Sequence, residues 1–517
     1  MENKRGFLWQ GLLTTGVSLL LRAIGISAQI MIAARIGPEA VGVSALISGI
    51  GGFAVTLALS GVQPGCIRLI SQALGKCQIH SARQALYCSL IHALLFGSLS
   101  GLFLFSGANY IGSSWMGDTR IVIPLRILAF TLPLVSLSSC ISGYFVAVRR
   151  VYKSAFIQVT EEILRIGLTI ILLNYFPMNV ESALIALAIS NAVADILCAL
   201  LLSLLCAYDC QRLHPDCEKL KSCSNLSTFK QLLSITLPIA ITAYVRSGLI
   251  TWEHALIPRG LQAFGLDHSA ALAAYGTIQS MALPVILLPC ALLGSFAVLL
   301  VPELTEAHVR AEKQRIEFIM KRVFSLTLFF SIGTAGLMIA FSQELGYILY
   351  NNMDAAQMIR YLAPLIPIMY LDGATDAMLK GLGQQVYSMK VNIADATISV
   401  LLVAWLLPNF GIYGYIITIY VTELLNAALS ILRLIHIGAM RPRIVSWIVK
   451  PIFGIIGATC LTRLIDLQFS QYFTNSFYMG RIIVLMLAVI LFYIIFLVLL
   501  GSLNRQDIRW LKSFLYP

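Results

Sequence analysis

The sequence predicts an all-α polytopic membrane protein with about 14 transmembrane helices, and three observations lead to this class. Of the 517 residues, 58% are hydrophobic and only 12% are charged, whereas a soluble domain carries roughly a quarter charged residues. The apolar residues stand in long continuous runs, near or above the ~20 residues that a helix needs to cross a bilayer. Transmembrane strands would give short alternating segments instead. The basic residues gather in alternate connections between the runs.

The first run, residues 12–39, carries one arginine, Arg22, near its middle and ends at Arg35, Gly37 and Pro38. A charge at that depth of a bilayer is costly, so it usually faces a protein interior or a wet cavity rather than lipid. We therefore expect Arg22 to face the inside of the protein.

A second run, residues 232–260, repeats this pattern with Arg246 in its middle and Arg259 at its end. Arg246 follows Arg22 by 224 residues, and Arg259 follows Arg35 by the same number. A cation placed twice at one register predicts a shared central site between two pseudo-symmetric halves. Arg22 and Arg246 would bind an anion in a central cavity. Arg35 and Arg259 would lie near the outer mouth of this cavity, and Arg68 near its inner mouth. The predicted anion-binding set is Arg22, Arg246, Arg35, Arg259 and Arg68.

The other runs follow in order along the chain. Each is long enough for a membrane helix. The predicted span centres are Leu20, Val55, Leu95, Leu134, Thr169, Ile196, Tyr244, Leu287, Ile332, Ile368, Leu401, Ile419, Ile455 and Ile490.

Lysine and arginine are divided unequally between the two sides of the membrane. Taking alternate connections, one side holds about 25 of the 36 Lys and Arg residues and the other about 7. Because cytoplasmic loops carry the excess of basic residues, we predict a cytoplasmic-membrane protein with both termini in the cytosol. The same asymmetry explains the net charge of +12 without a nucleic-acid partner.

Internal similarity extends beyond the two arginine-bearing runs. The Val-Tyr pairs at 151 and 386 are 235 residues apart, as are Asn191 and Asn426. Both halves begin in the cytosol, which makes them parallel repeats. The predicted parts are a six-helix lobe at 1–207, a cytosolic linker at 208–228, a second six-helix lobe at 229–438, and two additional helices with a short basic tail at 439–517.

The linker contains Cys210, His214, Cys217 and Cys223. A zinc site is the alternative here, but the spacing is not that of paired zinc knuckles, and reduced cytosolic thiols are the better interpretation. We expect no bound metal and no cofactor.

Acidic residues in the runs are candidates for binding a coupling cation or for neutralising an arginine. Glu253 lies seven residues after Arg246, about two turns along the same helix face, so a structural network is the alternative to an anion site. Similarly, Glu161 and Arg165 at i,i+4 favour a structural pair. The other candidates are Asp195 on the sixth run and Asp372 and Asp376 on the tenth, where Lys380 continues the column toward the cytosol.

Catalytic signatures are scarce in the sequence. It contains no HExxH, no GxSxG, no Walker loop and no extramembrane stretch long enough to hold a nucleotide sugar, which argues against an ATP-driven pump and against most glycosyltransferases. We expect no enzymatic activity.

Several longer segments point to a family. They are RAIG…ARIGPEAVG, SQALGK, YGTIQSMALPVILLPCALLGSFAVLLVPELTE and KGLGQQVYSMKVN…LPNFGIYGYI. They resemble the polysaccharide-transport branch of the multidrug/oligosaccharidyl-lipid/polysaccharide (MOP) exporter superfamily. Within it the likeness is to the stage V sporulation protein B group, which is similar in turn to the lipid II flippases.

The resemblance implies two six-helix lobes in a V shape, two extra C-terminal helices and alternating access. It implies movement of an undecaprenyl-pyrophosphate-linked saccharide or peptidoglycan precursor from the inner to the outer leaflet, for cell-wall, spore-cortex or polysaccharide synthesis. Essential arginines of the lipid II flippases resemble Arg22 and Arg246, and Glu253 is the nearest candidate for their acidic partner. The expected partners are therefore a lipid-linked oligosaccharide, membrane lipids and a coupling cation, bound by a monomer.

Three alternatives stay open at this stage. A cation-coupled multidrug exporter of the same fold would need an acidic cavity, which Arg22 and Arg246 argue against. A membrane saccharide polymerase or ligase would need a large outer loop with catalytic residues, and the outer loops are short. An inactive scaffold for envelope assembly would differ from a flippase only in activity.

Overall fold

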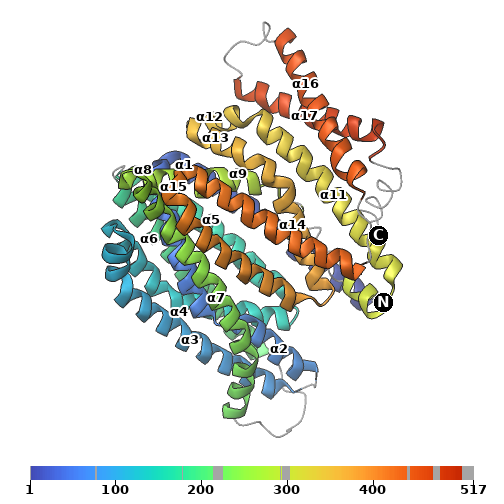
Figure 1. Cartoon of the computed structure of the whole chain (residues 1–517). Coiled ribbons are helices and arrows are strands. Elements are labelled where there is room, and N and C mark those ends of the chain that lie inside the picture. The colour runs from blue at the N-terminus through green and yellow to red at the C-terminus, as the bar shows by residue number, and fades with distance from the viewer. Residues whose placement is uncertain are drawn as a thin grey trace. The chain divides into compact units, whose positions relative to one another are not determined.

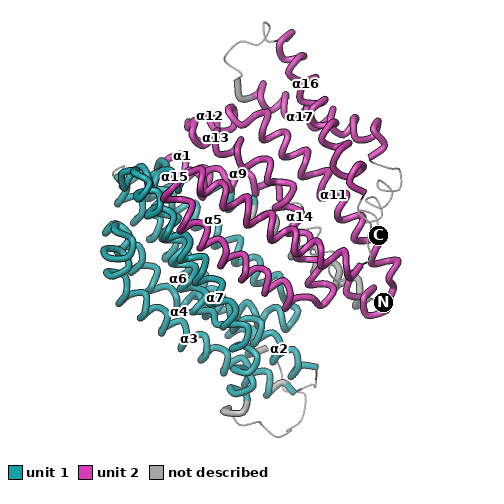
Figure 2. The backbone as a smooth tube through the Cα atoms, in the orientation of Figure 1, with its two compact units in different colours: residues 1–28, 36–276 teal, residues 29–35, 277–517 magenta. Residues whose placement is uncertain are grey.

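The computed structural model describes residues 2–75, 78–176, 179–212, 225–290, 293, 303–438, 443–469 and 478–502. Every regular element in this part of the chain is a helix (Figure 1), so the predicted all-α class is confirmed. Contacts divide the chain into two compact units, shown in Figure 2, which are described one at a time.

The first unit comprises residues 1–28 and 36–276. Its helices pack mainly around α4, which contacts α2, α3 and α6 extensively. Its elements are α1 (Glu2–Leu59), α2 (Val62–Gly75), α3 (Ile79–Asn109), the π-helix η1 (Tyr110–Met116), the 3-10 turn η2 (Thr119–Ile121), α4 (Val122–Ala147), α5 (Val151–Tyr175), α6 (Val180–Arg212), α7 (Asn225–Phe264) and α8 (His268–Gly276).

The second unit comprises residues 29–35, which are a short stretch of α1, and 277–517. Helix α11 lies at its centre and contacts both α14 and α16. Its elements are the π-helix η3 (Thr277–Ala282), α9 (Leu283–Leu287), α11 (Lys313–Ala340), α12 (Ser342–Tyr350), α13 (Met353–Leu362), the 3-10 turn η4 (Ala363–Leu365), α14 (Ile366–Gly381), α15 (Gln385–Gly438), the π-helix η5 (Val445–Val449), α16 (Lys450–Phe469) and α17 (Tyr478–Leu499).

Two of these helices are each a pair of spans joined at a glycine. In α1 the backbone leaves the helical conformation at Gly37, with φ 82° and ψ 168°, directly before Pro38. In α15 the same happens at Gly411, with φ 57°, shortly after Pro408. Only glycine adopts positive φ without a steric cost, and proline disrupts the preceding helical turn. The predicted end of the first span at Gly37 and Pro38 is confirmed.

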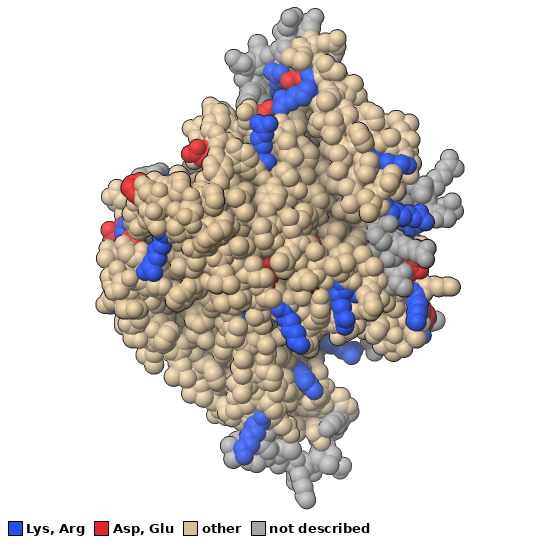
Figure 3. Space-filling view, viewed as in Figure 1, with Lys and Arg blue, Asp and Glu red and all other residues tan. Residues whose placement is uncertain are grey.

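The described helices agree with the predicted number of spans. Ten segments are long and apolar enough to cross a membrane, and two of them, Ala23–Gly75 and Gln385–Gly438, are 53 and 54 residues long, which is enough for two crossings each. Two further helices are not among these ten segments: α5 carries several charges, and α14 is short, with 16 residues. On the face in Figure 3, charged residues are few on a broad surface of other side chains.

The division into lobes at 1–207 and 229–438 stays a prediction. The compact units place α7 and α8 together with the first six helical spans. Helix α6 runs to Arg212 and α7 begins at Asn225, so both ends of the predicted linker, 208–228, are helical. His214, Cys217, Cys223 and the tail after residue 502 lie outside the described residues.

An ion-pair cluster explains why α6 continues past the predicted boundary. The carboxylate of Asp209 is almost fully buried and accepts hydrogen bonds from Arg150, from Lys153 at 2.5 Å and from the hydroxyl of Tyr144 at 3.1 Å. These partners come from α4 and α5 and the connection between them, so they hold the last turn of α6 against the fold. Charge-assisted bonds of this kind are stronger than neutral ones.

Close backbone contact fixes α8 against the second span of α1. A Cβ atom at Gly276 would lie 2.4 Å from the carbonyl oxygen of Pro38 and 2.6 Å from the backbone nitrogen of Gly42. Small residues permit this approach between membrane helices. Gly276→Ala is expected to destabilise the fold by ~1–3 kcal/mol through overpacking, seen as a lower thermal midpoint of the detergent-purified protein.

Gly52→Ala is the matched control, because a Cβ atom there would meet nothing within 4 Å. Equal midpoints for the Gly276 and Gly52 variants would show that the contact between α1 and α8 does not contribute to stability.

Candidate functional site

The predicted arginines occupy different surroundings in the structure. Arg246 lies near the middle of α7 and its side chain is exposed. Arg22 lies on α1, but its side chain is outside the described part of the structure. Arg35 and Arg68, on α1 and α2, are exposed. An exposed guanidinium on a membrane-crossing helix is favourable only where it faces water or a counter-charge, so the position of Arg246 is consistent with a wet site.

Arg259 has backbone partners. Its guanidinium donates to the carbonyl oxygens of Ser114, at 3.3 Å, and Trp115. The ring of Trp115 also lies 5.9 Å from that of Trp252 on α7. Arg259 therefore has a structural role, because it holds the end of η1 against α7. Anion binding by Arg259 stays a prediction.

Arg165 of α5 lies among three carboxylates. It donates to Glu161 at 2.5 Å, to Glu162 at 2.9 Å and to Asp195 of α6 at 3.4 Å. The expected pair with Glu161 is confirmed, and Asp195 proves to belong to the same cluster. Helical spacing in the sequence predicted the contact of Glu161 with Arg165. Asp195 is 30 residues from Arg165, and only the packing of α5 on α6 brings these two side chains together. Three carboxylates around one guanidinium leave a surplus of negative charge if all are ionised.

A second acidic group lies in the other unit. Asp376 of α14 pairs with Lys380 at 2.6 Å and accepts a hydrogen bond from Ser388 of α15. Asp372, one turn earlier, interacts electrostatically with Asp395 and Glu423 of α15. Acids from α15 therefore join the predicted column of Asp372, Asp376 and Lys380.

Glu253 of α7 is partly buried and has an interaction partner. It is two helical turns from Arg246 on the same face. The role of Glu253 as the acidic partner of a cavity arginine stays a prediction.

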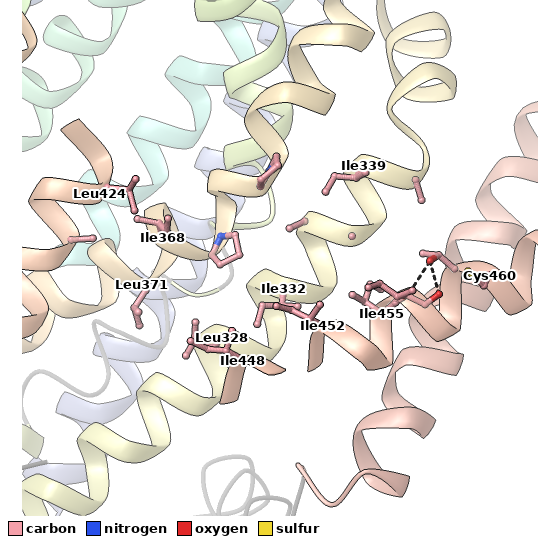
Figure 4. Close-up of a pocket in the computed structure, with 18 of the residues that line it drawn as sticks. Leu328, Ile332, Ile339, Ile368, Leu371, Leu424, Ile448, Ile452, Ile455 and Cys460 are labelled. Atoms are coloured by element: carbon pink, nitrogen blue, oxygen red, sulfur yellow. Dashed lines mark hydrogen bonds between the residues drawn. The ribbon is translucent and has the colours of Figure 1, made fainter. Parts of the chain in front are cut away.

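An apolar groove of about 890 Å³ lies within the second unit. Figure 4 shows that its walls come from α11, α14, α15 and the η5–α16 segment. Almost all of its lining is aliphatic, and Arg463, which pairs with Glu344 at 2.9 Å, is its charged exception. The sequence analysis missed this groove, because its walls come from four separate segments. Representative lining residues are Leu328, Ile332, Ile368, Leu424, Ile452 and Ile455.

A polar network ties together the connections of the first unit. Arg120 of η2 binds Asp118 through two nitrogens, at 2.7 and 2.9 Å, and Glu39 of α1 at 2.8 Å. His268, at the start of α8, lies 3.6 Å from Asp118 and 3.0 Å from Gln262 of α7. Burial alone would raise the pKa of Asp118, but the hydrogen bonds and charge of Arg120 outweigh it and hold the pKa below its ordinary value.

Comparison with known proteins shows similarity to two families. Residues 8–257 match the model of a family described as polysaccharide biosynthesis protein, and residues 262–406 match the MatE family. The stage V sporulation protein B of Bacillus subtilis (strain 168) is 27% identical over 418 residues, which is 80% of each chain. The chain is therefore similar to polysaccharide biosynthesis proteins over its first half and to the MatE family over much of its second half.

Solved structures show the same fold. The lipid II flippase MurJ, in an inward closed conformation, matches with a TM-score of 0.70 at 13% identity over 94% of this chain and 97% of its own. An inward-facing MATE-family multidrug resistance transporter matches with a TM-score of 0.63 at 13% identity, over 81% of this chain and 94% of its own. The predicted resemblance and the predicted fold are confirmed by these matches.

The described residues offer three kinds of chemistry. Exposed guanidinium groups on spans can bind phosphate oxygens bidentately. Clustered carboxylates can bind a cation or a proton. The apolar groove can accept a hydrocarbon chain. The described residues place carboxylate clusters in both units, the apolar groove in the second unit and Arg246 in the first.

The network at Asp118 predicts a pH dependence of stability. Because its pKa is lower in the folded chain than the ordinary 3.8, the unfolded chain binds more protons near that pH. The stabilisation is therefore complete above the ordinary carboxyl range and is lost as the pH falls through the folded-state value. Asp118→Asn should lower stability by ~1.5–3 kcal/mol at neutral pH, and the gap from wild type should shrink below about pH 4.

The measurement is thermal unfolding in detergent from pH 3 to 7. Asp267→Asn provides the control, because this nearby carboxylate is exposed and accepts a bond from Ser269. A gap for Asp118→Asn that stays constant over this range would contradict the assignment.

Proposed function

We propose that this protein is a flippase for a lipid-linked saccharide. It would move an undecaprenyl-pyrophosphate-linked saccharide or peptidoglycan precursor across the cytoplasmic membrane by alternating access, for cell-wall, spore-cortex or polysaccharide synthesis. The observation that carries the proposal is the arginine at membrane depth, Arg246, which is exposed on α7 and has a counterpart, Arg22, at the same register of α1. A pyrophosphate is the natural partner of paired guanidinium groups.

The apolar groove supports the same substrate class. A lipid-linked saccharide joins a charged headgroup to a long hydrocarbon tail, and the tail needs an apolar path during transport. The groove of about 890 Å³ beside α11 and α16 offers such a path without burying polar groups. The MurJ match and the sporulation relative add support from proteins whose names state a lipid II flippase and a sporulation role.

The acids are proposed as coupling or partner groups. Transport without ATP needs an ion gradient or the membrane potential, and Asp195, Asp372 and Asp376 lie in clusters where a cation or proton would be stabilised. Glu253 is proposed as the partner of Arg246. Arg35, Arg68 and Arg259 are proposed to guide the anion at the two mouths.

A second candidate function is export of cationic drugs. It is favoured by the MatE match over 262–406 and by the surplus of carboxylates around Arg165. A flippase for an anionic headgroup needs the positive charges of Arg22 and Arg246, whereas an exporter of cationic drugs does not. Variants at these two positions therefore distinguish the two functions.

The decisive test is flipping in liposomes that contain purified protein and a fluorescent undecaprenyl-pyrophosphate saccharide. Arg22→Ala and Arg246→Ala should each lower the flipping rate about 10- to 100-fold, because a lost charge-assisted bond costs ~1.5–3 kcal/mol. Arg360→Ala, on an exposed face of α13, should retain the wild-type rate.

Each outcome has a clear meaning. Wild-type rates in both arginine variants would remove these residues from the site. Absence of wild-type flipping, together with export of cationic dyes, would replace the flippase by the drug exporter.

We also propose that both termini face the cytosol, on the basis of the basic-residue asymmetry. Green fluorescent protein fused after Pro517 should fluoresce in bacterial cells, and alkaline phosphatase there should be inactive. Alkaline phosphatase inserted after Gly265, between α7 and α8, should be active. The reversed pattern would refute this orientation.

A further inference from the structure

A polar cavity of about 190 Å³ lies inside the first unit. Its walls come from α2, α4, α5 and α6, which pack on one another in this unit. All four wall segments are helices. The predicted anion site does not include any of its lining residues.

The walls carry hydroxyl and amide groups that have no protein partner. Ser138, Ser139 and Ser142 of α4 face Gln63 of α2 and Gln158 of α5 across the cavity. No side-chain hydrogen bond joins any of the five to another described residue, and the Ser138 hydroxyl oxygen is buried without a partner. Ser142 is itself only 6% exposed. Buried polar groups are nearly always hydrogen-bonded, so the Ser138 hydroxyl requires water or a ligand.

One end of the cavity has fixed hydrogen-bond acceptors. Glu161 and Asp195 line it, and both carboxylates are held by Arg165, at 2.5 and 3.4 Å. Glu162 binds the same guanidinium at 2.9 Å. The net negative charge disfavours a phosphate here and favours hydroxyl or ammonium donors. An occupant therefore carries donors for these oxygens and no anionic charge.

The size selects among neutral polar occupants. A volume of about 190 Å³ corresponds to roughly six waters at ~30 Å³ each, which is the space of one sugar ring. Hydroxyls, amides and carboxylates spread over several helical turns can each meet a different hydroxyl of such a ring. A single metal ion needs its ligands within one compact shell, and the searched residues of the described part include no metal-binding group of three or more His, Cys, Asp and Glu.

From these observations we infer that the cavity is a saccharide subsite, which receives one hydroxyl-rich sugar ring of the transported headgroup. The inference rests on the proposed flippase function and adds where the sugar binds. Glu162, the neighbour of the lining residue Glu161, lies close to α1, since a Cβ atom at Gly25 would be 3.3 Å from its carboxylate oxygen.

The test compares binding of lipids with and without sugar to the full-length protein in detergent. The probes are undecaprenyl pyrophosphate and its glucose, galactose and N-acetylglucosamine conjugates. Wild type should bind at least one conjugate about tenfold more tightly than the sugar-free lipid. The triple variant S138A/S139A/S142A should lose this preference, while its affinity for the sugar-free lipid stays unchanged.

Ser136→Ala is the matched control on the same helix. The Ser136 hydroxyl donates to the carbonyl oxygen of Ala58 at 2.9 Å instead of facing the cavity. This variant should keep the sugar preference and have a lower thermal midpoint. The triple variant should have an unchanged or higher midpoint, because unpaired hydroxyls cost free energy when buried.

Three results would overturn the subsite. The first is equal binding of sugar-bearing and sugar-free lipids by wild type while flipping continues, which would leave the flippase proposal intact. The second is a triple variant with the full sugar preference. The third is sodium-dependent binding of both lipids that the triple mutation weakens equally, which would make the cavity a cation site. Sugar preference without any flipping would instead retain the subsite and refute the flippase.

Discussion

A charge inside a membrane-crossing helix costs free energy unless it has a partner, and this constraint explains how the charged residues of this protein are paired. Arg165 illustrates the solution: one guanidinium on α5 gathers Glu161, Glu162 and Asp195, so no member of the cluster is left alone in an apolar surrounding. The cluster joins α5 to α6 and passes close to α1 at Gly25. The polar cavity lies beside this cluster and is lined by two of its carboxylates, Glu161 and Asp195.

The two compact units differ in what they can bind. The described part of the first unit contains hydroxyls, amides and carboxylates around a small cavity and an exposed arginine on α7. The described part of the second unit contains the large aliphatic groove. An amphiphilic substrate needs both surroundings, since a sugar requires hydrogen bonds and a prenyl chain requires the exclusion of water.

The helices also contain the features that permit a change of shape. Gly37 and Gly411 interrupt α1 and α15 with positive φ, each close to a proline. At such points a helix bends with little loss of hydrogen bonding, because the interrupted carbonyls are already free of helical partners. Tight backbone contact at Gly42 and Gly276 does the opposite and holds α8 firmly on α1. Rigid groups of helices joined at a few bends are what alternating access requires.

The sequence by itself determined the class, the number of spans and the family resemblance, because apolar run length and local motifs are properties of neighbouring residues. It also determined the pairs at helical spacing, such as Glu161 with Arg165 and Asp376 with Lys380. The tertiary structure decided which distant groups meet: Asp195 with Arg165, Arg259 with the carbonyls of Ser114 and Trp115, and the four walls of the groove. Such contacts join segments 30 to 145 residues apart, and only packing brings them within hydrogen-bond distance, since no periodicity in a single helix records its neighbours.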